Sequence, residues 1–174
     1  LESAKLLHHM KFSNGYLFSF ILWVNVWVES EQRFKSNEFV FSRKDISSIL
    51  PYYKEGNETF VVLVKEFRSP VRNEAGLVYE LPGGSALKPG VNPQENAQHE
   101  LEEETGIHIE DLSRFSFVKN KQLCATLSSH HSYLYKVELT KEEFEMVKKN
   151  VESQTVFGLP EDTEIIYLEV MPIS

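Results

Sequence analysis

The chain has 174 residues, of which 41% are hydrophobic and 25% are charged, as expected for one globular domain with a buried core. Its 26 acidic residues outnumber 18 basic ones, and the formal net charge is −8. Because nucleic acids are bound through clustered Lys and Arg, this balance argues against a nucleic-acid partner. Cys124 is the single cysteine, which excludes an intrachain disulfide.

The most apolar stretch, 16–28, is too short to cross a bilayer and contains Ser19 and Asn25. No small-residue cleavage site follows it, as one would in a signal peptide. We therefore expect no membrane partner and a cytoplasmic location, with a trimmed targeting segment as the open alternative because the chain begins with Leu1.

Residues 1–15 are weakly patterned and predict no element. Residues 17–28 alternate with a period of two, which predicts a strand whose one face is aliphatic and aromatic and whose other face carries Trp23 and Trp27. These tryptophans are either covered by a second layer of the chain itself or mark a homodimer surface, and we favour the homodimer.

Short apolar segments predict the remaining strands, which are 39–41, 46–50, 60–64, 77–81, 116–118, 133–137 and 165–170. A turn is expected at 54–57. A helix is expected to begin after Thr140, because Glu143 completes a capping box and an apolar stripe follows. Strands before and after one strong helix predict a mixed sheet covered by helices.

That strong helix spans about 93–105. Asn92 is a good N-cap, Pro93 suits the first helical position, and Gly106 is a natural residue to end it. We expect one domain over 1–174, in which 1–35 form an N-terminal extension with a strand and 36–174 form the core.

The last turns of this helix concentrate carboxylates where the helix dipole disfavours them, at about 0.3–1 kcal/mol each. Glu100, Glu103 and Glu104 share one arc of the helix, whereas Glu102 points elsewhere. A divalent cation would reverse this repulsion, because Mg²⁺ prefers carboxylate and phosphate oxygens. The competing interpretation is a solvated acidic face.

Residues 99–107, HELEEETGI, resemble the core of the Nudix box, R-E-U-x-E-E-x-G-U with U aliphatic. Gly83-Gly84 and Pro89-Gly90 are similar to the loop that precedes the box. The segments 47–50, 61–68 and 80–84 look like the branch that hydrolyses ADP-ribose and other nucleoside diphosphate sugars. The similarity is good over 39–107 and thin after 110.

The resemblance implies an α/β/α sandwich with a mixed β-sheet and a metal-binding loop-helix-loop. It implies a hydrolase that cleaves a pyrophosphate bond with Mg²⁺ or Mn²⁺ as cofactor. The implied metal ligands are Glu100, Glu103, Glu104 and the carbonyl of Gly84, with Glu100 and Glu103 also catalytic. The implied substrate-binding residues are Arg68, Arg72 and Glu80, and a surface arginine at a strand end is the equal alternative for Arg68.

Three positions depart from the family pattern. His99 replaces the arginine of the box, Val91 falls where a glutamate is expected, and the loop from Gly84 is one residue longer. These changes predict weakened rather than abolished catalysis, because the lost groups would support a metal-binding glutamate.

The fourth catalytic carboxylate of related enzymes comes from a late loop, which here corresponds to 128–132 and contains no acid. His130 is the candidate general base there, and the alternative interpretation is a polar loop residue without a catalytic role. Further candidates for the missing carboxylate are Glu161, Asp162 and Glu164, if they fold back over the site. The alternative interpretation is a solvated acidic loop.

Three functions remain open. The first is metal-dependent hydrolysis of ADP-ribose or a related nucleoside diphosphate sugar. The second is a non-catalytic Nudix-fold module that binds a nucleotide or a protein, as His99 and Val91 suggest. The third is an enzyme for another diphosphate, such as coenzyme A, a dinucleotide or an RNA cap.

Overall fold

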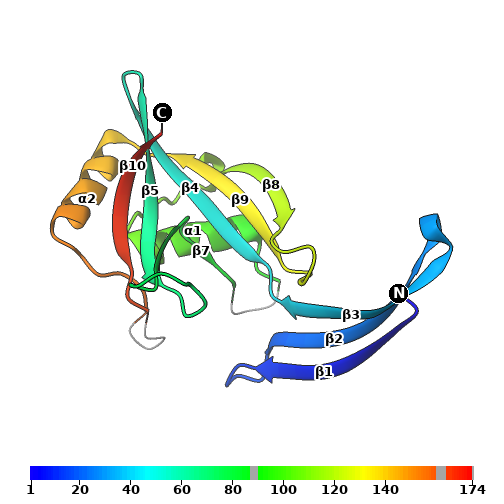
Figure 1. Ribbon diagram of the computed structural model, residues 1–174. Helices are drawn as coiled ribbons and strands as arrows, with labels where there is room; N and C mark the ends of the chain where they lie inside the picture. Colours follow the sequence, from blue (N-terminus) through cyan, green and yellow to red (C-terminus); the bar gives the residue numbers. More distant parts are fainter. Residues whose placement is uncertain (87–89, 160–163, 174) are drawn as a thin grey trace.

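The N-terminal part of the chain forms a three-stranded antiparallel sheet. The computed structural model describes residues 1–86, 90–159 and 164–173, and in it this sheet has the order β1 (Ser3–Lys11), β2 (Leu17–Val28) and β3 (Arg33–Arg43), with the short 3₁₀ helix η1 (Glu29–Glu31) between β2 and β3 (Figure 1). The predicted strand at 17–28 is confirmed. β1 was not predicted, because all its residues are exposed and no buried face imposes an alternating pattern.

A second, mixed sheet forms the body of the protein. Its members are β4 (Ile46–Glu55), β5 (Glu58–Phe67), β6 (Leu77–Glu80), β7 (Gly83–Gly84), β8 (Ser116–Gln122), β9 (His131–Glu138) and β10 (Tyr167–Ile173). The main order is β10-β5-β4-β9-β8, with β6 beside β5 and β7 beside β4. β4 and β9 are parallel and the other pairs antiparallel, so the predicted mixed α/β architecture is confirmed.

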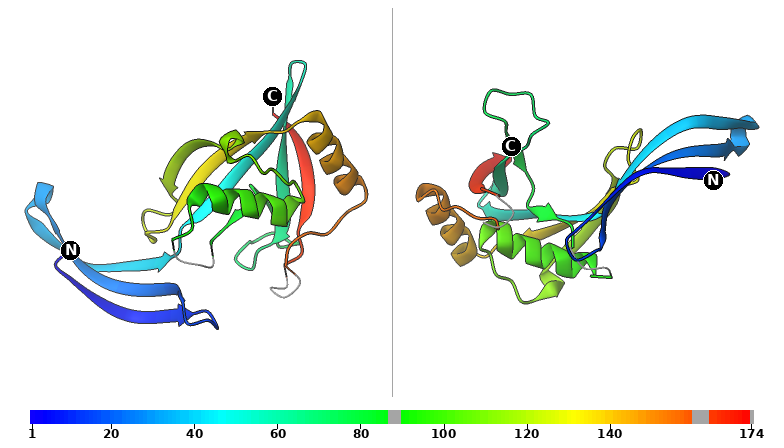
Figure 2. Two further views of the ribbon diagram at one scale, coloured as in Figure 1. Left: turned by 180° about the vertical axis from the view of Figure 1, so that it is seen from behind. Right: turned by 90° about the horizontal axis from the view of Figure 1, so that it is seen from below.

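The helix α1 (Pro93–Thr105) has the predicted bounds. Asn92 accepts a hydrogen bond from the N–H of Gln94 at 2.9 Å, which satisfies one of the unpaired N–H groups of the first turn. Gly106 ends the helix in the left-handed conformation, with φ 73°, and its N–H donates to the carbonyl of Glu102. α1 packs against β4 and lies in front of it in the view from behind (Figure 2).

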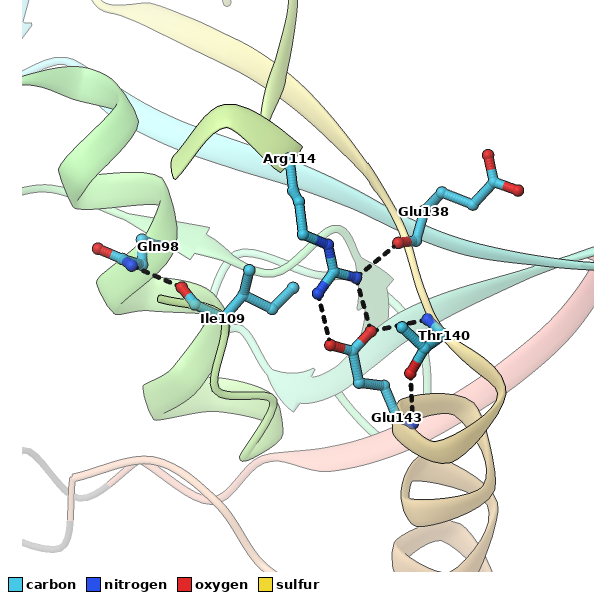
Figure 3. Close-up of polar contacts among 6 residues, drawn as sticks. All are labelled: Gln98, Ile109, Arg114, Glu138, Thr140 and Glu143. Carbon is cyan, nitrogen blue, oxygen red and sulfur yellow. Dashed lines mark hydrogen bonds and ion pairs between the residues drawn. The ribbon is translucent and has the colours of Figure 1, made fainter. Parts of the chain in front are cut away.

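The second helix, α2 (Lys141–Glu152), begins at the predicted capping box of Thr140 and Glu143. Figure 3 shows that Arg114, the last residue of the 3₁₀ helix η2 (Leu112–Arg114), pairs with Glu143 at 2.7 Å and donates to the carbonyl of Glu138 at 2.8 Å. The hydrogen bond from Arg114 lowers the pKa of Glu143, although burial opposes it. In the same view, Gln98 of α1 donates to the carbonyl of Ile109 at 2.6 Å and holds the chain that leaves the helix.

One continuous apolar core joins both helices to the second sheet. α1 contributes Ala97 and Leu101, and α2 contributes Phe144 and Val147. Facing them are buried strand residues, which include Ile49, Val62, Val64, Val137 and Leu168. Removing this surface from water is the main driving force for the fold.

The N-terminal sheet extends to one side of this body (Figures 1 and 2). Backbone hydrogen bonds tie its end to the loop before β9: Phe41 donates to Leu127 at 2.8 Å, and Ser129 donates to Phe41 at 3.2 Å. Trp23 and Trp27 keep 39% and 38% of their surface exposed, so no second layer of the described chain covers them.

Candidate active site

The short strand β7 brings two glycines between β4 and α1. It pairs with Ser47 and Ser48 of β4. A Cβ atom on Gly83, which has φ 154°, would lie 2.2 Å from the carbonyl oxygen of Ser47, and one on Gly84 would lie 2.6 Å from Oε2 of Glu100. Glycine at position 83 therefore lets the loop backbone approach β4 this closely, and the backbone of Gly84 lies directly against the Glu100 carboxylate.

Two carboxylates of α1 lie beneath these glycines. Glu104 is 7% exposed and accepts a 2.8 Å hydrogen bond from the N–H of Gly83. Burial and the charges of neighbouring acids raise the pKa of Glu104 to about 8, although the Gly83 hydrogen bond opposes this. Burial, Glu103 and Glu164 raise the pKa of Glu100 to about 7. The site thus gathers negative charge in a poorly solvated place.

Glu103 and Glu102, the other two glutamates in the last turns of the helix, differ in exposure, as their positions predict. The Glu103 side chain is 20% exposed, and its Oε2 lies 3.4 Å from Nδ1 of His99, whose side chain is 74% exposed. Glu102 is exposed and pairs with His108 at 2.9 Å, so its interpretation as a solvated residue is confirmed. Val91 is 38% exposed.

Asn96 is a residue of this site that the sequence reasoning missed. It is 7% exposed and donates a 2.9 Å hydrogen bond to the carbonyl of Gly84. A carbonyl oxygen has a second lone pair, so this bond orients Gly84 without preventing coordination. The available signal was spacing, because Asn96, Glu100 and Glu104 recur every four residues along one face of the helix.

Arg68 lies at the end of β5 in a fork of two acids. Its Nη1 donates to Glu66 at 2.9 Å, and its Nε and Nη2 donate to Glu80 at 3.1 and 2.9 Å. Burial opposes protonation, but both glutamates raise the pKa of Arg68 overall. Glu66 is 6% exposed and its own pKa is raised, chiefly by burial. Arg72 is exposed in the loop between β5 and β6.

Of the three late acids, the structure describes Glu164. Its charge raises the pKa of Glu66, Glu100 and Glu104, so its carboxylate lies within electrostatic range of all three. The role of Glu164 in the site stays a prediction. Glu161 and Asp162 lie outside the described residues, as does Pro89 of the loop before α1.

His130 lies at a different edge of the site. It is 9% exposed, and burial and then the charge of Arg43 lower its pKa. The charged or titratable groups that shift its pKa are Arg43, Asp45 and His131, none of which is a glutamate of α1. His131 is half-buried, and its backbone N–H donates to Asp45.

The donor chemistry of the α1 face suits a divalent metal ion. Within 1–86, 90–159 and 164–173, no three His, Cys, Asp or Glu side chains already form a complete metal-binding cluster. The glutamates are nevertheless oxygen donors whose mutual repulsion and burial a cation would relieve, and Gly84 presents its backbone directly against Glu100. The residues present therefore fit a hard divalent cation.

The comparisons agree with this geometry. The model of the NUDIX domain matches residues 43–171, which is more than half of the chain and extends well beyond the segment 39–107 that carries the clearest resemblance. No curated protein matches the chain. Neither described helix has the length and apolar character needed to cross a membrane. The chain belongs to the Nudix family, whose members are in general pyrophosphohydrolases that use a divalent metal ion.

Proposed function

We propose that this protein is a Mg²⁺- or Mn²⁺-dependent hydrolase of ADP-ribose or a related nucleoside diphosphate sugar. The observation that supports this most is the apposition of Glu100 and Glu104 to Gly83-Gly84, in a site that also holds Arg68. Such a place has too much negative charge to accept a diphosphate unless cations accompany it.

In this proposal Glu100, Glu103, Glu104 and the Gly84 carbonyl hold the metal. When bound, the metal neutralises the diphosphate and makes a coordinated water more acidic. Asn96 fixes the carbonyl of Gly84, so that the loop does not need to reorganise when substrate enters.

The attacking water must lose a proton to a group of this chain. Glu100, Glu103 and His130 are the proposed acceptors, and Glu164 is a further one because it lies within electrostatic range of the α1 carboxylates. The buried Nε2 atom of His130 has no hydrogen-bond partner among the described residues, so it lacks a proton-transfer partner that a bound ligand or water would supply.

Substrate contacts are proposed for Arg68, Arg72 and Glu80. Glu66 and Glu80 hold the Arg68 guanidinium in a fixed orientation, which suits recognition of phosphate or sugar oxygens. The Glu80 side chain is 42% exposed and can accept a sugar hydroxyl. Arg72 is exposed and can approach from the loop between β5 and β6.

The decisive experiment measures product formation from ADP-ribose, UDP- and GDP-sugars, coenzyme A and dinucleotides, with and without Mg²⁺ or Mn²⁺. Glu104→Gln is the test variant, and Glu102→Gln is the matched control, because it makes the same change at an exposed position of the same helix. Metal-dependent turnover that Glu104→Gln abolishes and Glu102→Gln retains supports the hydrolase and names its substrate.

The second candidate function is a binding module without turnover. It is favoured by His99, which replaces the arginine of the box. The His99 side chain is exposed, and within the described residues the acid with which it pairs is Glu103. Nucleotide binding by a folded protein, with no product from any substrate, would select this function.

We also propose a homodimer that forms through the N-terminal sheet. Both faces of β2 carry apolar side chains, and large exposed ones gather on the sheet, among them Leu6, Met10, Trp23, Trp27, Phe34 and Phe39. An isolated sheet of this size needs a covered face to be stable. A second copy fits because the edge strand β1 can pair with its own counterpart about a twofold axis.

A further inference from the structure

Arg43 is a half-buried cation whose charge no described carboxylate balances. It is the last residue of β3, and its Nε atom is buried without a hydrogen-bond partner among the described residues. Its guanidinium donates one long hydrogen bond, 3.3 Å from Nη2 to Oγ of Ser85, and stacks over the Phe18 ring at 5.4 Å. Buried charges are normally paired, so this arrangement calls for an anion.

The neighbouring Arg68 adds to the unbalanced positive charge. Burial and then the charge of Arg68 lower the pKa of Arg43, so the two guanidinium groups repel each other. Arg68 is already compensated by Glu66 and Glu80. Arg43 has no such compensating acid among the described residues.

His130 supplies a second buried nitrogen at the same place. Its Nε2 is buried without a partner in the described chain, and the residue is 9% exposed. The charge of Arg43 acts directly on it. Three hydrogen bonds hold its loop on β3: Phe41 to Leu127, Ser129 to Phe41, and the Ser129 hydroxyl to the Ser42 hydroxyl at 2.8 Å. Two unpartnered nitrogens thus come from separate segments that are fixed to each other.

This place adjoins the glutamate site. Ser85, which accepts from Arg43, directly follows Gly84, and Gly84 lies against Glu100. Arg68, which repels Arg43, is in turn within electrostatic range of Glu104. A group bound at Arg43 would therefore belong to a molecule that also reaches the α1 carboxylates.

We infer that Arg43, together with His130, binds a phosphate group of the substrate at the junction of β3 and β4. Phosphate supplies both the negative charge that Arg43 lacks and several acceptor oxygens for two nitrogens that approach from different segments. A neutral sugar hydroxyl would leave the Arg43 charge unbalanced. The inference rests on the proposed function, since it assigns a contact for the same diphosphate substrate. It leaves Glu100, Glu103 and Glu164 as the proposed proton acceptors, because a His130 nitrogen that binds phosphate cannot also be the base.

The test measures binding of AMP and of adenosine by calorimetry, in EDTA so that no metal or turnover contributes. In the unmodified protein AMP binds more tightly than adenosine. Arg43→Gln is expected to weaken AMP binding by about 10- to 100-fold, the range that loss of a charge-assisted contact produces, and to leave adenosine binding unchanged. Arg33→Gln is the matched control, because Arg33 is exposed on the same strand and pairs only with Glu31 in the described chain.

Thermal unfolding separates binding from a structural role. Removal of an unbalanced, half-buried charge should leave the melting temperature of Arg43→Gln unchanged or raise it, whereas loss of a structural anchor would lower it. The His130 imidazole, followed by NMR, should show a higher pKa when AMP is bound, because phosphate offsets the Arg43 charge. The other charged or titratable groups that act on His130 are Asp45, which raises its pKa, and His131, which lowers it.

The two proposals fail in different ways. AMP binding that Arg43→Gln does not change would overturn this inference, even if the protein hydrolyses a sugar diphosphate. Loss of AMP binding in Arg43→Gln, combined with no turnover of any substrate, would uphold the phosphate contact and reject the hydrolase.

Discussion

The backbone N–H of Gly83 donates a 2.8 Å hydrogen bond to Oε2 of Glu104. This bond links β7 to the acidic face of α1, and it stabilises the ionised form of Glu104. Burial and the surrounding acids act more strongly in the opposite direction, so the metal-free site opposes ionisation of Glu104.

The first prediction is that Glu104→Gln stabilises the metal-free protein at pH 8. Because the folded-state pKa is raised from 4.5 to about 8, the folded protein binds more protons than the unfolded chain in that window, and stability falls as the pH rises through it. Glutamine still accepts from Gly83 but carries no charge. Urea unfolding in EDTA should show a gain on the order of 2 kcal/mol at pH 8 and little gain at pH 4.5.

The same variant should lose its response to metal. Mg²⁺ is expected to raise the unfolding midpoint of the unmodified protein, because it binds the folded state alone. Glu102→Gln should behave like the unmodified protein in both buffers. A destabilised Glu104→Gln in EDTA would show that the ionised carboxylate contributes more to folding than it costs.

The second prediction concerns the contact between Asn96 and Gly84. Asn96→Ala removes the donor to the Gly84 carbonyl and should lower metal affinity or kcat by roughly 10- to 100-fold, as loss of an outer contact to a metal site does. Gln98→Ala is the control, because it removes a comparable helix-to-loop hydrogen bond, to Ile109. If metal titrations give the same affinity for both variants, Asn96 has only a structural role.

The third prediction is that Glu143 holds α2 in place. Glu143→Ala removes both the capping contact with Thr140 and the pair with Arg114, and it should reduce the free energy of unfolding by roughly 2–3 kcal/mol. Glu145→Ala, which breaks an exposed pair with Lys148, should leave stability unchanged.

The contribution of Glu143 depends on pH with a defined sign. Its folded-state pKa is lowered from 4.5, so its stabilisation is complete above pH 4.5 and is lost as the pH falls through the folded-state value. Urea unfolding of both variants at pH 7 and at pH 3 tests this. If Glu143→Ala loses the same unfolding free energy at pH 3 as at pH 7, the stabilisation by Glu143 does not have an ionic origin.

The sequence predicts best where local chemistry decides the structure. Asn92, Pro93 and Gly106 fix both ends of α1, and Thr140 with Glu143 fixes the start of α2, because capping involves residues a few positions apart. The mixed sheet follows from strands separated by these helices.

Prediction fails where contacts join distant segments. β1 has no buried face and is defined only by pairing with β2. The charge of Glu164 acts on Glu100, and the charge of Arg43 acts on His130, across sequence separations that no local pattern encodes. Asn96 lies between these cases, because its helical spacing from Glu100 is visible but its acceptor, Gly84, is set by the tertiary fold.

The last prediction concerns the exposed N-terminal sheet. Trp23→Glu should convert a dimer into a monomer in sedimentation at micromolar concentration, because a charge at a desolvated aromatic position opposes association. Val156→Glu is the control, since Val156 is 54% exposed on the body of the protein. An unmodified protein that sediments as a monomer at these concentrations rejects the dimer directly. If Trp23→Glu is monomeric and still folded by circular dichroism, its turnover then shows whether the sheet acts only in assembly. Reduced turnover would mean that assembly also positions the loop of His130, to which Phe41 of β3 is hydrogen-bonded through Leu127 and Ser129.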